Sequence, residues 1–478
     1  MNTSCLSWRS WTAVSALLAV TTICIGCEAA ARPHRTGAAD VRTGTGWDAV
    51  PAILARIKAP EFPARDFAVT DYGARPDGTT DASEAIAKAI AACHAAGGGR
   101  VVVAGGTFLT GPIHLKSRVN LHVAEGATLK FNPDPGAYLP VVRVRFEGTE
   151  CMNYSPLIYA FEQEHIAVTG KGTLDGSASA ETWWGLGRRA AAGPGGGPPL
   201  LGGRQLIEMG EKGVPVEQRV FGAAGSLRPN FIVPYRCKDI LIEDVRIVNS
   251  PMWEINPVLC SNITVRGVNV FSHGPNNDGC NPDSCRDVLI EDCVFDTGDD
   301  CIAIKSGKDA DGRRVGVPSE NVVIRRCTMK DGHGGVVLGS ETSGGIRNVF
   351  AEDCKMDSPN LDRALRLKTN SGRGGALENV FFRNVEVGRV AHSVLTIDLV
   401  YGRVTEGPFP PVVRTVVMEG VTVASCPRVL SIVGTPKSVV EGVRIRGCTF
   451  RGVEGADVLT HSGSVAYEDV NLEPAKAR

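Results

Sequence analysis

Short runs in which apolar and polar residues alternate recur along the second half of the chain. Eight of these runs align without gaps, and they begin at residues 239, 262, 287, 321, 348, 379, 415 and 442. Each run is rich in β-branched and other apolar residues, as in DVLIEDC at 287 and NVVIRRC at 321, and a polar or small residue suited to a turn stands at its start. The pattern predicts one short β-strand per repeat.

The spacing of the repeats indicates a solenoid. Successive runs start 23 to 36 residues apart, so a coil of constant size carries loops of different lengths. One repeat cannot bury its own apolar face, whereas stacked repeats form a continuous core. Leucine-rich repeats need a Leu-x-x-Leu-x-Leu pattern and propeller blades need about 40 residues each, and the runs fit neither. We predict an all-β fold over residues 64–470, a right-handed, single-stranded parallel β-helix of about ten coils, with earlier coils near Val101, Val119 and Ile166.

A helix is expected at the start of this domain. Asp81 stands before a stretch in which Ile86, Ile90 and Cys93 recur at helical spacing. This arrangement predicts an amphipathic helix that is N-capped by Asp81. Because an open coil end exposes unpaired backbone groups, we expect the helix to cover the first coil.

The N-terminal residues have the features of a secretory signal. Arg9 precedes an apolar run over 11–26, and small residues follow it. The alternative, a membrane-spanning helix, needs about 20 apolar residues. We predict a signal peptide over 1–27, an Ala-, Arg-, Gly- and Thr-rich linker over 28–63, and export of the protein. The Ile-Gly-Cys sequence that ends at Cys27 resembles a bacterial lipoprotein cleavage box, so Cys27 is a candidate for a lipid anchor.

Composition narrows the function classes. Lys plus Arg number 51 and Asp plus Glu number 52, for a net charge of −1, whereas proteins that bind nucleic acid by counterion release carry a basic excess. We therefore expect no nucleic-acid partner. The 56 glycines in 478 residues exceed the usual level of about 7%, which is typical of a β-rich chain with many turns.

The cysteines favour a packing role. Fifteen are present, and twelve of them follow the leader. Cys293, Cys327, Cys354 and Cys448 occupy one column of the repeat, so we expect them to stack as small apolar side chains that face the core. The body of the chain has no Cys-x-x-Cys pair and no His/Cys cluster with zinc spacing. We predict no structural metal and no cofactor.

Polar residues gather in three of the predicted coils: SHGPNNDG at 272–279, TGDDC at 297–301 and DGHGG at 331–335. Asp299 lies 12 residues after the start of one run, and His333 lies 12 residues after the start of the next. Both therefore occupy one column on coils about 4.7–4.9 Å apart. Asp278 precedes Asp299 by 21 residues, close to one coil, which can bring it beside the Asp299–Asp300 pair. By its offset, Arg366 is expected in a loop beside the column.

Three carboxylates, a histidine and an Arg/Lys pair within a few coils indicate a hydrolytic site. Clustered negative charge destabilises a fold unless it has a use. One carboxyl group with a raised pKa can protonate a glycosidic oxygen, and the others can hold and deprotonate a water. The spacing leaves a cation site or a turn-forming Asp ladder open as alternatives.

The motifs NND-G, G-DD, G-H-G and R-L-K, in this order on a predicted β-helix, resemble the signature of glycoside hydrolase family 28, the polygalacturonases. The resemblance extends from about residue 66 to residue 460. It implies an inverting, single-displacement hydrolysis of α-1,4-galacturonosidic bonds in polygalacturonate or pectin. By position it implies that Asp299 is the general acid and that His333 tunes this acid. Asp278 and Asp300 would activate the attacking water.

The same resemblance implies the substrate contacts. Arg366 and Lys368 resemble the cations that hold a galacturonate carboxylate. Tyr401 stands where the family has a substrate-contacting tyrosine, and Asn276 belongs to the NND motif. The family more often has Asn-Thr-Asp and Arg-Ile-Lys in the two motifs, and both departures are conservative. Asp283 competes for the base role, although it falls outside the NxDG pattern and fits a turn position.

Two long excursions, 176–225 and 305–321, leave the coils that precede and enclose these motifs. Loops of neighbouring coils emerge on the same side of a β-helix, so both can block one end of a groove, which favours exo action. Their arginines suit either an anionic terminal sugar or a solvated surface: Arg188, Arg189, Arg313 and Arg314. Trp183 and Trp184 fit equally well stacking on sugar rings and a hydrophobic latch for the loop.

Other functions stay open on the sequence alone. A rhamnogalacturonan hydrolase belongs to the same family. A pectate lyase would need a calcium site of several Asp or Glu and an Arg base, and a non-catalytic carbohydrate-binding β-helix would not need clustered carboxylates. We expect a monomer that acts on pectin oligosaccharides.

Overall fold

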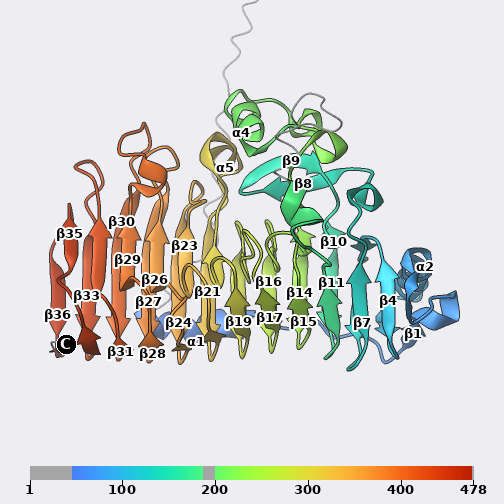
Figure 1. Cartoon of the computed structure of the whole chain (residues 1–478), viewed down its shortest axis with the longest axis horizontal. Helices are drawn as coiled ribbons and strands as arrows, with labels where there is room; N and C mark the ends of the chain where they lie inside the picture. Colours follow the sequence, from blue (N-terminus) through green and yellow to red (C-terminus); the bar gives the residue numbers. More distant parts are fainter. Residues whose placement is uncertain (1–45, 187–199, 476–478) are drawn as a thin grey trace, which may run out of the picture. The chain divides into compact units, whose positions relative to one another are not determined.

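Three parallel β-sheets surround one continuous apolar core in the computed structural model of the protein (Figure 1). The structure describes residues 46–186 and 200–475, which belong to one compact unit, Thr43–Arg478. The first and second sheets have thirteen strands each, and neighbouring strands of a sheet come from successive coils. This arrangement is a parallel β-helix and confirms the predicted fold class.

Each of the three sheets forms one wall of the β-helix. The strands of the first sheet are β1 (Asp66–Ala68), β3 (Gly99–Val103), β6 (Val119–Val123), β11 (Glu164–Thr169), β14 (Lys238–Glu243), β16 (Ser261–Arg266), β18 (Arg286–Glu291), β21 (Ser319–Arg325), β24 (Ile346–Glu352), β27 (Ala376–Arg383), β30 (Val412–Glu419), β33 (Glu441–Arg446) and β36 (Val465–Glu468). Those of the second sheet are β2 (Asp77–Asp81), β4 (Thr107–Thr110), β7 (Thr128–Phe131), β12 (Thr173–Asp175), β15 (Arg246–Val248), β17 (Asn269–Ser272), β19 (Val294–Thr297), β22 (Thr328–Met329), β25 (Lys355–Met356), β28 (Glu386–Arg389), β31 (Thr422–Ser425), β34 (Thr449–Val453) and β37 (Asn471–Pro474).

The third wall is in two parts. One part has the strands β5 (Ile113–His114), β10 (Ile158–Phe161) and β13 (Ile232–Tyr235). The other has β20 (Ile302–Ile304), β23 (Val336–Gly339), β26 (Arg363–Lys368), β29 (Ser393–Asp398), β32 (Leu430–Val433) and β35 (Val458–Thr460). Single bridges through Ile255 and Cys280 join the two parts, so the third wall is irregular in the coil that carries Asp278.

The first sheet counts thirteen coils, so the prediction of about ten was too low. Its terminal strands, β1 and β36, pair with one neighbour each. Their residues are mostly exposed or half-buried, so they do not show the alternation that marks the inner strands. The sequence pattern therefore misses the two ends.

Each aligned run coincides with a strand of the first sheet, and the residue at its start makes the turn. Asp287, Asn321, Asn348 and Asn379 have φ between 55° and 59°, in the left-handed region that Asp and Asn tolerate. The Nδ2 of Asn321 donates to Oδ1 of Asp287 (3.1 Å), and Asn348 and Asn379 continue the ladder at 3.1 and 3.0 Å. These side chains fix both the turn and the coil-to-coil register.

The cysteines pack as predicted. All twelve cysteines among the described residues are buried and form no disulfide. Cys293, Cys327, Cys354 and Cys448 all belong to the main apolar core. The column of small apolar side chains is confirmed.

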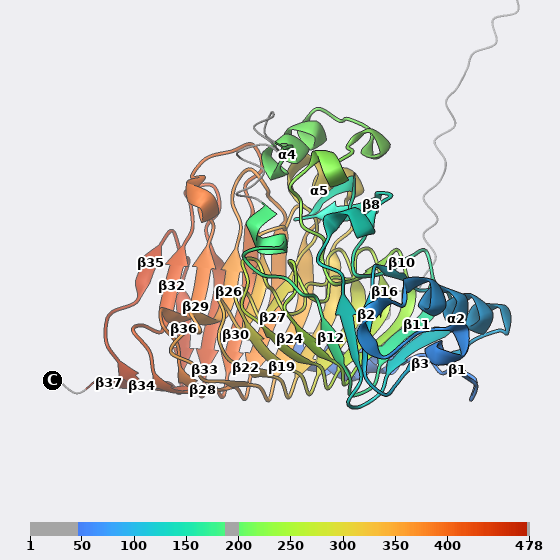
Figure 2. The same cartoon turned by 45° about the vertical axis from the view of Figure 1, so that its right-hand side comes forward.

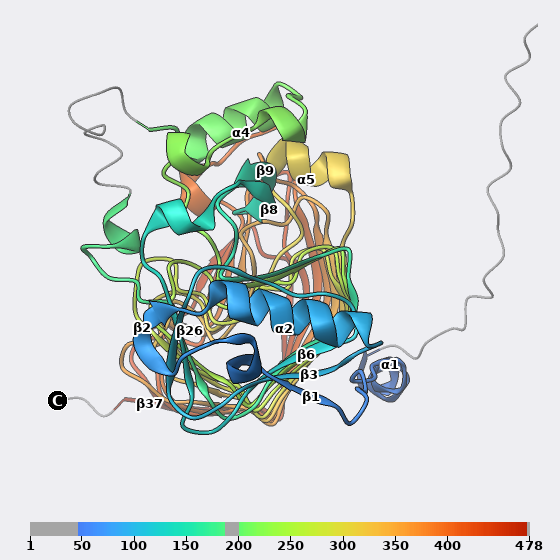
Figure 3. The ribbon, with the colours of Figure 1, turned by 90° about the vertical axis from the view of Figure 1, so that its right-hand side faces the viewer.

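Helix α2 (Ser83–Ala95) covers the open end of the first coil (Figure 3). It buries the predicted stripe of Ile86, Ile90 and Cys93. The helix begins at Ser83, whose backbone N–H donates to Oδ1 of Asp81 (2.9 Å). The Asp81 carboxylate therefore satisfies a first-turn donor, as capping requires, with Ala82 between it and the helix.

The prediction of a linker over 28–63 is wrong for its second half. Residues 46–56 form η1 (Gly46–Ala49) and α1 (Val50–Arg56), which pack against the outer face of the first sheet. The ring of Trp47 lies 5.5 Å from that of Phe350 and 6.2 Å from that of Phe381. These outward-facing aromatic rings supply apolar contacts that the composition of the segment does not reveal. The predicted signal peptide and Cys27 lie outside the described residues.

Loops above the sheets form a further layer (Figure 2). Strands β8 (Val142–Phe146) and β9 (Thr149–Asn153) make an antiparallel hairpin, and helix α4 (Gly203–Glu211) contacts α5 (Asp309–Val315). The remaining described short helices are η2 (Val69–Tyr72), η3 (Pro135–Tyr138), η4 (Trp183–Gly185), η6 (Val216–Gln218), η7 (Gly222–Ala224) and η8 (Tyr401–Arg403). Since α4 and α5 contact each other, the two excursions carry helices that touch.

Within the described ranges, every helix is too short or too polar to cross a bilayer.

The tryptophan pair anchors the first excursion. Trp183 is buried, with ring centroids 5.3 Å from Tyr138 and 5.8 Å from Tyr154. The Nε1 of Trp184 donates to the carbonyl of Ser250 (2.9 Å). Of the two readings, the latch is therefore the one that the structure shows. Arg188 and Arg189 lie outside the described residues.

Candidate active site

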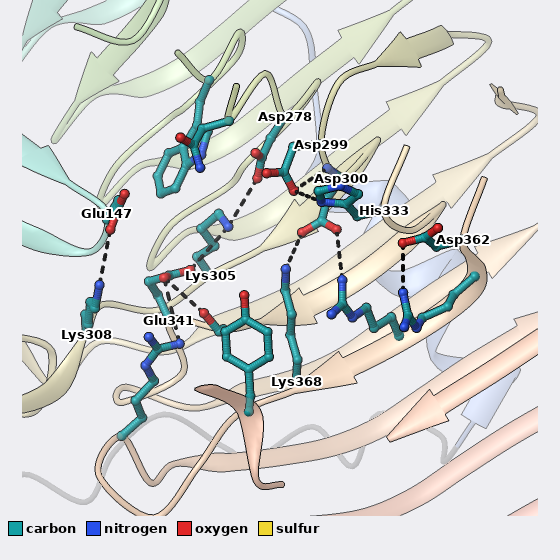
Figure 4. A pocket seen from close by; sticks show the side chains of 17 residues that line it. Glu147, Asp278, Asp299, Asp300, Lys305, Lys308, His333, Glu341, Asp362 and Lys368 are labelled. Carbon is teal, nitrogen blue, oxygen red and sulfur yellow. Dashed lines mark hydrogen bonds and ion pairs between the residues drawn. The ribbon is translucent and has the colours of Figure 1, made fainter. Parts of the chain in front are cut away.

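All eight predicted site residues line one pocket of about 480 Å³ (Figure 4). They are Asn276, Asp278, Asp299, Asp300, His333, Arg366, Lys368 and Tyr401. The loops after β17, β19 and β22 supply the first five, and η8 supplies the last. Arg366 lies within β26 rather than in a loop, because the third sheet, which the repeat pattern does not mark, supplies this side of the pocket.

The three carboxylates are crowded. One oxygen of each of Asp278, Asp299 and Asp300 lies within 4.8 Å of the others. Asp278 and Asp300 are buried, whereas the Asp299 side chain is 18% exposed. The Nδ1 of His333 lies 3.0 Å from Oδ1 of Asp299, which confirms the column expected from the 12-residue offsets.

Cations neutralise the two buried carboxylates. The Nζ of Lys368 donates to Oδ2 of Asp300 at 2.7 Å, and Nη1 of Arg366 lies 3.7 Å from Oδ1 of the same residue. The Nζ of Lys305 lies 3.4 Å from Oδ2 of Asp278. The three carboxylates present the oxygens that a metal ion would use, but two lysines already contact them.

Burial and the neighbouring charges set the proton distribution. Burial raises the pKa of Asp278 well above its usual range, and the negative charge of Asp299 raises it further. Burial also opposes ionisation of Asp299, but the hydrogen bond with His333 and the charge of Lys368 outweigh it and lower the pKa of Asp299. The same hydrogen bond raises the pKa of His333. Burial and the neighbouring charge therefore favour the protonated form of Asp278, whereas His333 and Lys368 favour the ionised form of Asp299.

The sequence motifs do not predict nine further residues that line the pocket: Glu147, Trp253, Lys305, Lys308, Ser340, Glu341, Asp362, Arg363 and Arg373. Lys305 gave a usable signal, because it follows the apolar run CIAI, where a lysine becomes buried and needs a partner. Its Nζ lies 4.4 Å from the ring of Trp253 and 3.2 Å from Oε2 of Glu341. No local pattern marks the others, because they come from loops whose packing decides where they lie.

One end of the pocket is walled by the β8–β9 hairpin. At its tip, Glu147 pairs with Lys308 (3.2 Å). A Cβ on Gly148 would lie 2.9 Å from both Lys308 and Glu341, so only glycine allows this approach. We call this part of the pocket, lined by Glu147, Lys308, Glu341 and Arg373, the walled end. Figure 4 shows the carboxylates between this end and Asp362 at the other.

Arg313 and Arg314 do not line the pocket, and the Arg314 side chain is 47% exposed at the surface. Arg314 pairs with Glu150 and with Asp311, and Arg313 stacks on a neighbouring loop. Both guanidinium groups therefore contact side chains of neighbouring loops.

Asp283 is also outside the pocket lining. Its Oδ1 accepts from Nη1 of Arg145 (2.8 Å) and from the backbone N–H of Gly307 (2.9 Å). Both side chains are buried, so the pair joins the hairpin to the coil and has a structural role. This placement argues against Asp283 as the base.

Comparison with known proteins identifies the family. The chain matches the model of glycosyl hydrolases family 28 over residues 220–463, more than half of its length. It belongs to this family. Residues 67–133 match the model described as rhamnogalacturonase A/epimerase, pectate lyase-like.

Individual relatives agree with this assignment. A solved exopolygalacturonase from Thermotoga maritima is 46% identical, with a TM-score of 0.84 over 88% of this chain and 95% of that chain. A probable polygalacturonase from Vitis vinifera is 32% identical over 67% of this chain and 60% of its own length. An exo-poly-alpha-D-galacturonosidase from Dickeya chrysanthemi is 29% identical over 70% of this chain and 57% of its own length. The chain thus spans somewhat less than two thirds of the length of each of these two curated relatives.

Proposed function

We propose that this family 28 protein hydrolyses α-1,4-galacturonosidic bonds of polygalacturonate and removes sugars from a chain end. The observation that carries the proposal is one pocket in which three carboxylates, within 4.8 Å of one another, adjoin Arg366, Lys368 and Arg373. Carboxyl groups supply the acid and the base of glycosidic cleavage. A uronate carboxylate that leaves water needs fixed positive charge to offset its desolvation. The names of the three similar proteins support the same substrate class.

In the proposed reaction, Asp299 is the general acid. It is the one carboxyl of the three that is partly exposed to the pocket, and His333 orients it. Its proton passes to the glycosidic oxygen while the bond from that oxygen to C1 breaks. Asp278 and Asp300 hold a water and accept its proton while the water oxygen bonds to C1. The products are a free sugar hemiacetal and a chain shortened at its end.

The proposed roles need a protonated Asp299 and an ionised Asp278. Despite burial, the hydrogen bond with His333 and the charge of Lys368 lower the pKa of Asp299, whereas burial raises the pKa of Asp278. A substrate carboxylate that pairs with Lys368 would offset this positive charge and raise the pKa of Asp299, as a general acid requires.

The stereochemistry needs its own measurement. Inverting glycosidases usually hold their carboxyl groups roughly 6.5–9.5 Å apart, and retaining enzymes roughly 5–5.5 Å. One oxygen of each carboxyl group here lies within 4.8 Å of the others, and this distance between selected oxygens does not by itself select either mechanism. Inversion is consistent with this spacing if Asp278 and Asp300 jointly hold the water. Proton NMR of the first product anomer decides: net retention would contradict the single displacement.

Exo action is supported by the walled end. The hairpin tip meets Lys308 and Glu341 there, so a polymer could extend from the pocket only in the other direction. The full chain should release a single short product from polygalacturonate from the first minutes, with little loss of viscosity. A sharp fall in viscosity with little released sugar would overturn exo action.

The same assay separates the alternatives. Unsaturated product that disappears with a chelator would indicate a lyase. Sugar released only from rhamnogalacturonan would indicate the other activity in this family. Binding without any cleavage would indicate a carbohydrate-binding β-helix.

Export is part of the proposal. It rests on the apolar run over 11–26 and on a substrate that is a polymer too large to enter cells. Fractionation of producing cells should place the protein outside the cytoplasm, and a Cys27→Ser variant should leave the membrane fraction if Cys27 carries a lipid. A cytoplasmic full-length protein would contradict export.

A further inference from the structure

Arg373 and Arg366 differ from the other four Lys and Arg side chains of the pocket. Lys305, Lys308, Arg363 and Lys368 each lie 2.7 to 3.2 Å from a carboxylate oxygen, whereas Nη1 of Arg366 lies 3.7 Å from Oδ1 of Asp300. The Nη1 of Arg373 is 3.9 Å from Oε1 of Glu341, too far for a hydrogen bond. This buried nitrogen has no hydrogen-bond partner among the described residues. A buried donor left unpaired destabilises the fold, so the position calls for an acceptor from outside the chain.

The Arg373 side chain is held in place rather than free to search for a partner. It is 12% exposed, and its guanidinium lies 5.7 Å from the ring centroid of Tyr401. Asn370 shapes the loop: its Oδ1 accepts from the backbone N–H groups of Gly372 and Arg373, and its Nδ2 donates to the carbonyl of Tyr401. A cation fixed in this way loses little conformational entropy when it binds an anion.

Arg313 fastens the same loop from outside the pocket. Its Nη1 donates to the carbonyls of Gly372 (2.9 Å) and Arg373 (3.2 Å), and its guanidinium stacks 3.6 Å over the ring of Phe409. Helix α5, the 370–374 loop and the loop of Phe409 therefore meet at one side chain. This contact explains why an arginine of the second excursion matters for a pocket that it does not enter.

The place of Arg373 in the pocket suggests which sugar it would meet. It contacts Glu341, which lies at the walled end in Figure 4 on the side away from Asp362. Lys368 and Arg366 both contact Asp300, so part of their charge already serves a catalytic carboxylate. Arg373 faces Glu341 at 3.9 Å, and its buried Nη1 still has a hydrogen bond to offer a second anion near the wall.

We propose that Arg373 binds the C6 carboxylate of the chain-terminal uronate sugar at the walled end, and that Arg313 is a positioning residue that holds Arg373 there. The inference rests on the proposed function. A guanidinium fork matches a carboxylate with two parallel hydrogen bonds, which selects a uronate over the corresponding neutral sugar. The terminal residue of the polymer would thus be recognised by its charge as well as by the wall.

The test uses trigalacturonate and two analogues, each with a neutral galactose at one end of the trimer. The wild-type chain should discriminate against both analogues in kcat/KM. Arg373→Met should raise KM for trigalacturonate roughly 10- to 100-fold, the range of a charged hydrogen bond. It should also lose the discrimination against one analogue and keep that against the other. Retained discrimination against both, or a proportional loss against both, would overturn the proposal.

A matched control excludes general damage to the loops. Arg314→Met removes the adjacent arginine of α5, which contacts Asp311 and the hairpin but not the 370–374 loop. The Arg314→Met chain should discriminate against the two analogues as the wild type does, when it is compared with Arg373→Met under conditions in which both chains are folded. If Arg314→Met alters the preference as Arg373→Met does, the effect arises from loop packing, and the proposal is wrong.

The role of Arg313 has a separate readout. Arg313→Met should raise KM less than Arg373→Met and leave kcat unchanged, and Arg313→Lys, which keeps one donor, should restore part of the loss. Because Arg313 acts through Arg373, the double variant should be no worse than Arg373→Met alone. Additive losses would contradict the positioning role.

Failure of the proposed function can be distinguished from failure of the proposed Arg373 site. The Asp299→Asn chain should bind trigalacturonate in calorimetry, and Arg373→Met in that background should weaken binding. Arg373-dependent binding without hydrolysis by the wild type would refute the activity and keep the site. Hydrolysis that is indifferent to Arg373 would refute the site and keep the activity.

Discussion

Two columns of charged side chains cross the same coils, and they are built in opposite ways. On the first sheet, glutamate and arginine alternate without exception over nine neighbouring strands. This charge ladder consists of Glu243, Arg266, Glu291, Arg325, Glu352, Arg383, Glu419, Arg446 and Glu468. Its members pair directly, as Arg325 does with Glu291 (2.7 Å) and Arg383 with Glu352 (2.6 Å). Every charge faces its opposite.

In the pocket, like charges are neighbours. Asp278, Asp299 and Asp300 bring three carboxylates together, and two of them are buried. Repulsion between like charges grows where water is excluded. Burial, and then the charges of Asp299 and Asp300, raise the pKa of Asp278, although Lys305 and Lys368 oppose the shift. The scaffold can alternate charges where it serves stability alone. Its failure to do so in the pocket marks the place where the charges serve chemistry.

The largest expected effect comes from removing the proton of the acid. Asp299→Asn should lower kcat by roughly 10²–10⁴-fold, because an amide cannot protonate the leaving oxygen. A galacturonide with an activated aryl leaving group needs little protonation, so Asp299→Asn should retain much more of the wild-type rate on it. Initial rates on both substrates measure this difference.

Asp278→Asn is the matched control for that measurement. It removes one of the two groups that take the proton of the water, so the aryl leaving group should not restore its rate. If Asp278→Asn recovers on the aryl substrate and Asp299→Asn does not, the two carboxylates exchange roles. The raised pKa of Asp278 would then belong to the general acid.

The next largest effect is expected when a substitution removes one cation from the pocket. Lys368→Met keeps much of the side-chain volume and deletes the charge that contacts Asp300 at 2.7 Å. We expect kcat/KM on polygalacturonate to fall by about 1.5–3 kcal/mol, the contribution of a charged hydrogen bond. Lys355→Met, at a lysine whose side chain is 70% exposed, should be neutral. A Lys368→Met chain with wild-type kcat/KM would rule out a role for this charge in substrate recognition.

A smaller effect concerns the pH dependence of His333. Its pKa is raised by the hydrogen bond with Asp299 and further by the charges of Asp300 and Asp362, against a lowering by burial. The stabilisation by the His333–Asp299 pair is therefore complete below the unfolded pKa of histidine and is lost as pH rises through the raised value. NMR titration of the imidazole should show the pKa falling toward about 6.5 in Asp299→Asn. An unchanged titration would mean that Asp299 does not hold the proton of His333.

The contrast between the columns also explains what the sequence can predict. The aligned runs, the turn asparagines and the cysteine column follow one local rule per coil, so the strands of the first sheet could be predicted from the sequence. The motifs of Asp278, Asp299 and His333 keep that register, and their meeting in one pocket could be predicted from offsets. No offset predicts Arg373, which is placed by Asn370 and by Arg313 on another loop.

The docked N-terminal segment was missed for a related reason. Trp47 packs on Phe350 and Phe381, which project from the outer face of the first sheet. Alternation in the repeat assigns such outward positions to solvent, and the segment of Trp47 has no periodic pattern long enough to predict a helix. Contacts between distant segments with no shared periodicity are decided by packing alone.

The smallest expected effect tests the charge ladder itself. Arg325→Met removes one pair with Glu291, which keeps Arg326 at 2.8 Å, so unfolding in urea should lose only about 0.2–1 kcal/mol. Arg325→Glu places three glutamates on neighbouring strands and should cost a similar amount again, because like charges directly opposite destabilise a sheet. The difference between the two variants should shrink in high salt, since position 325 is partly exposed and its charge is screened. Equal stability of both variants at low salt would mean that alternation does not stabilise this wall. The contrast with the pocket would then rest on the partners, because the buried ladder carboxylates Glu291 and Glu352 contact partly exposed arginines, whereas Asp278 and Asp300 contact buried lysines.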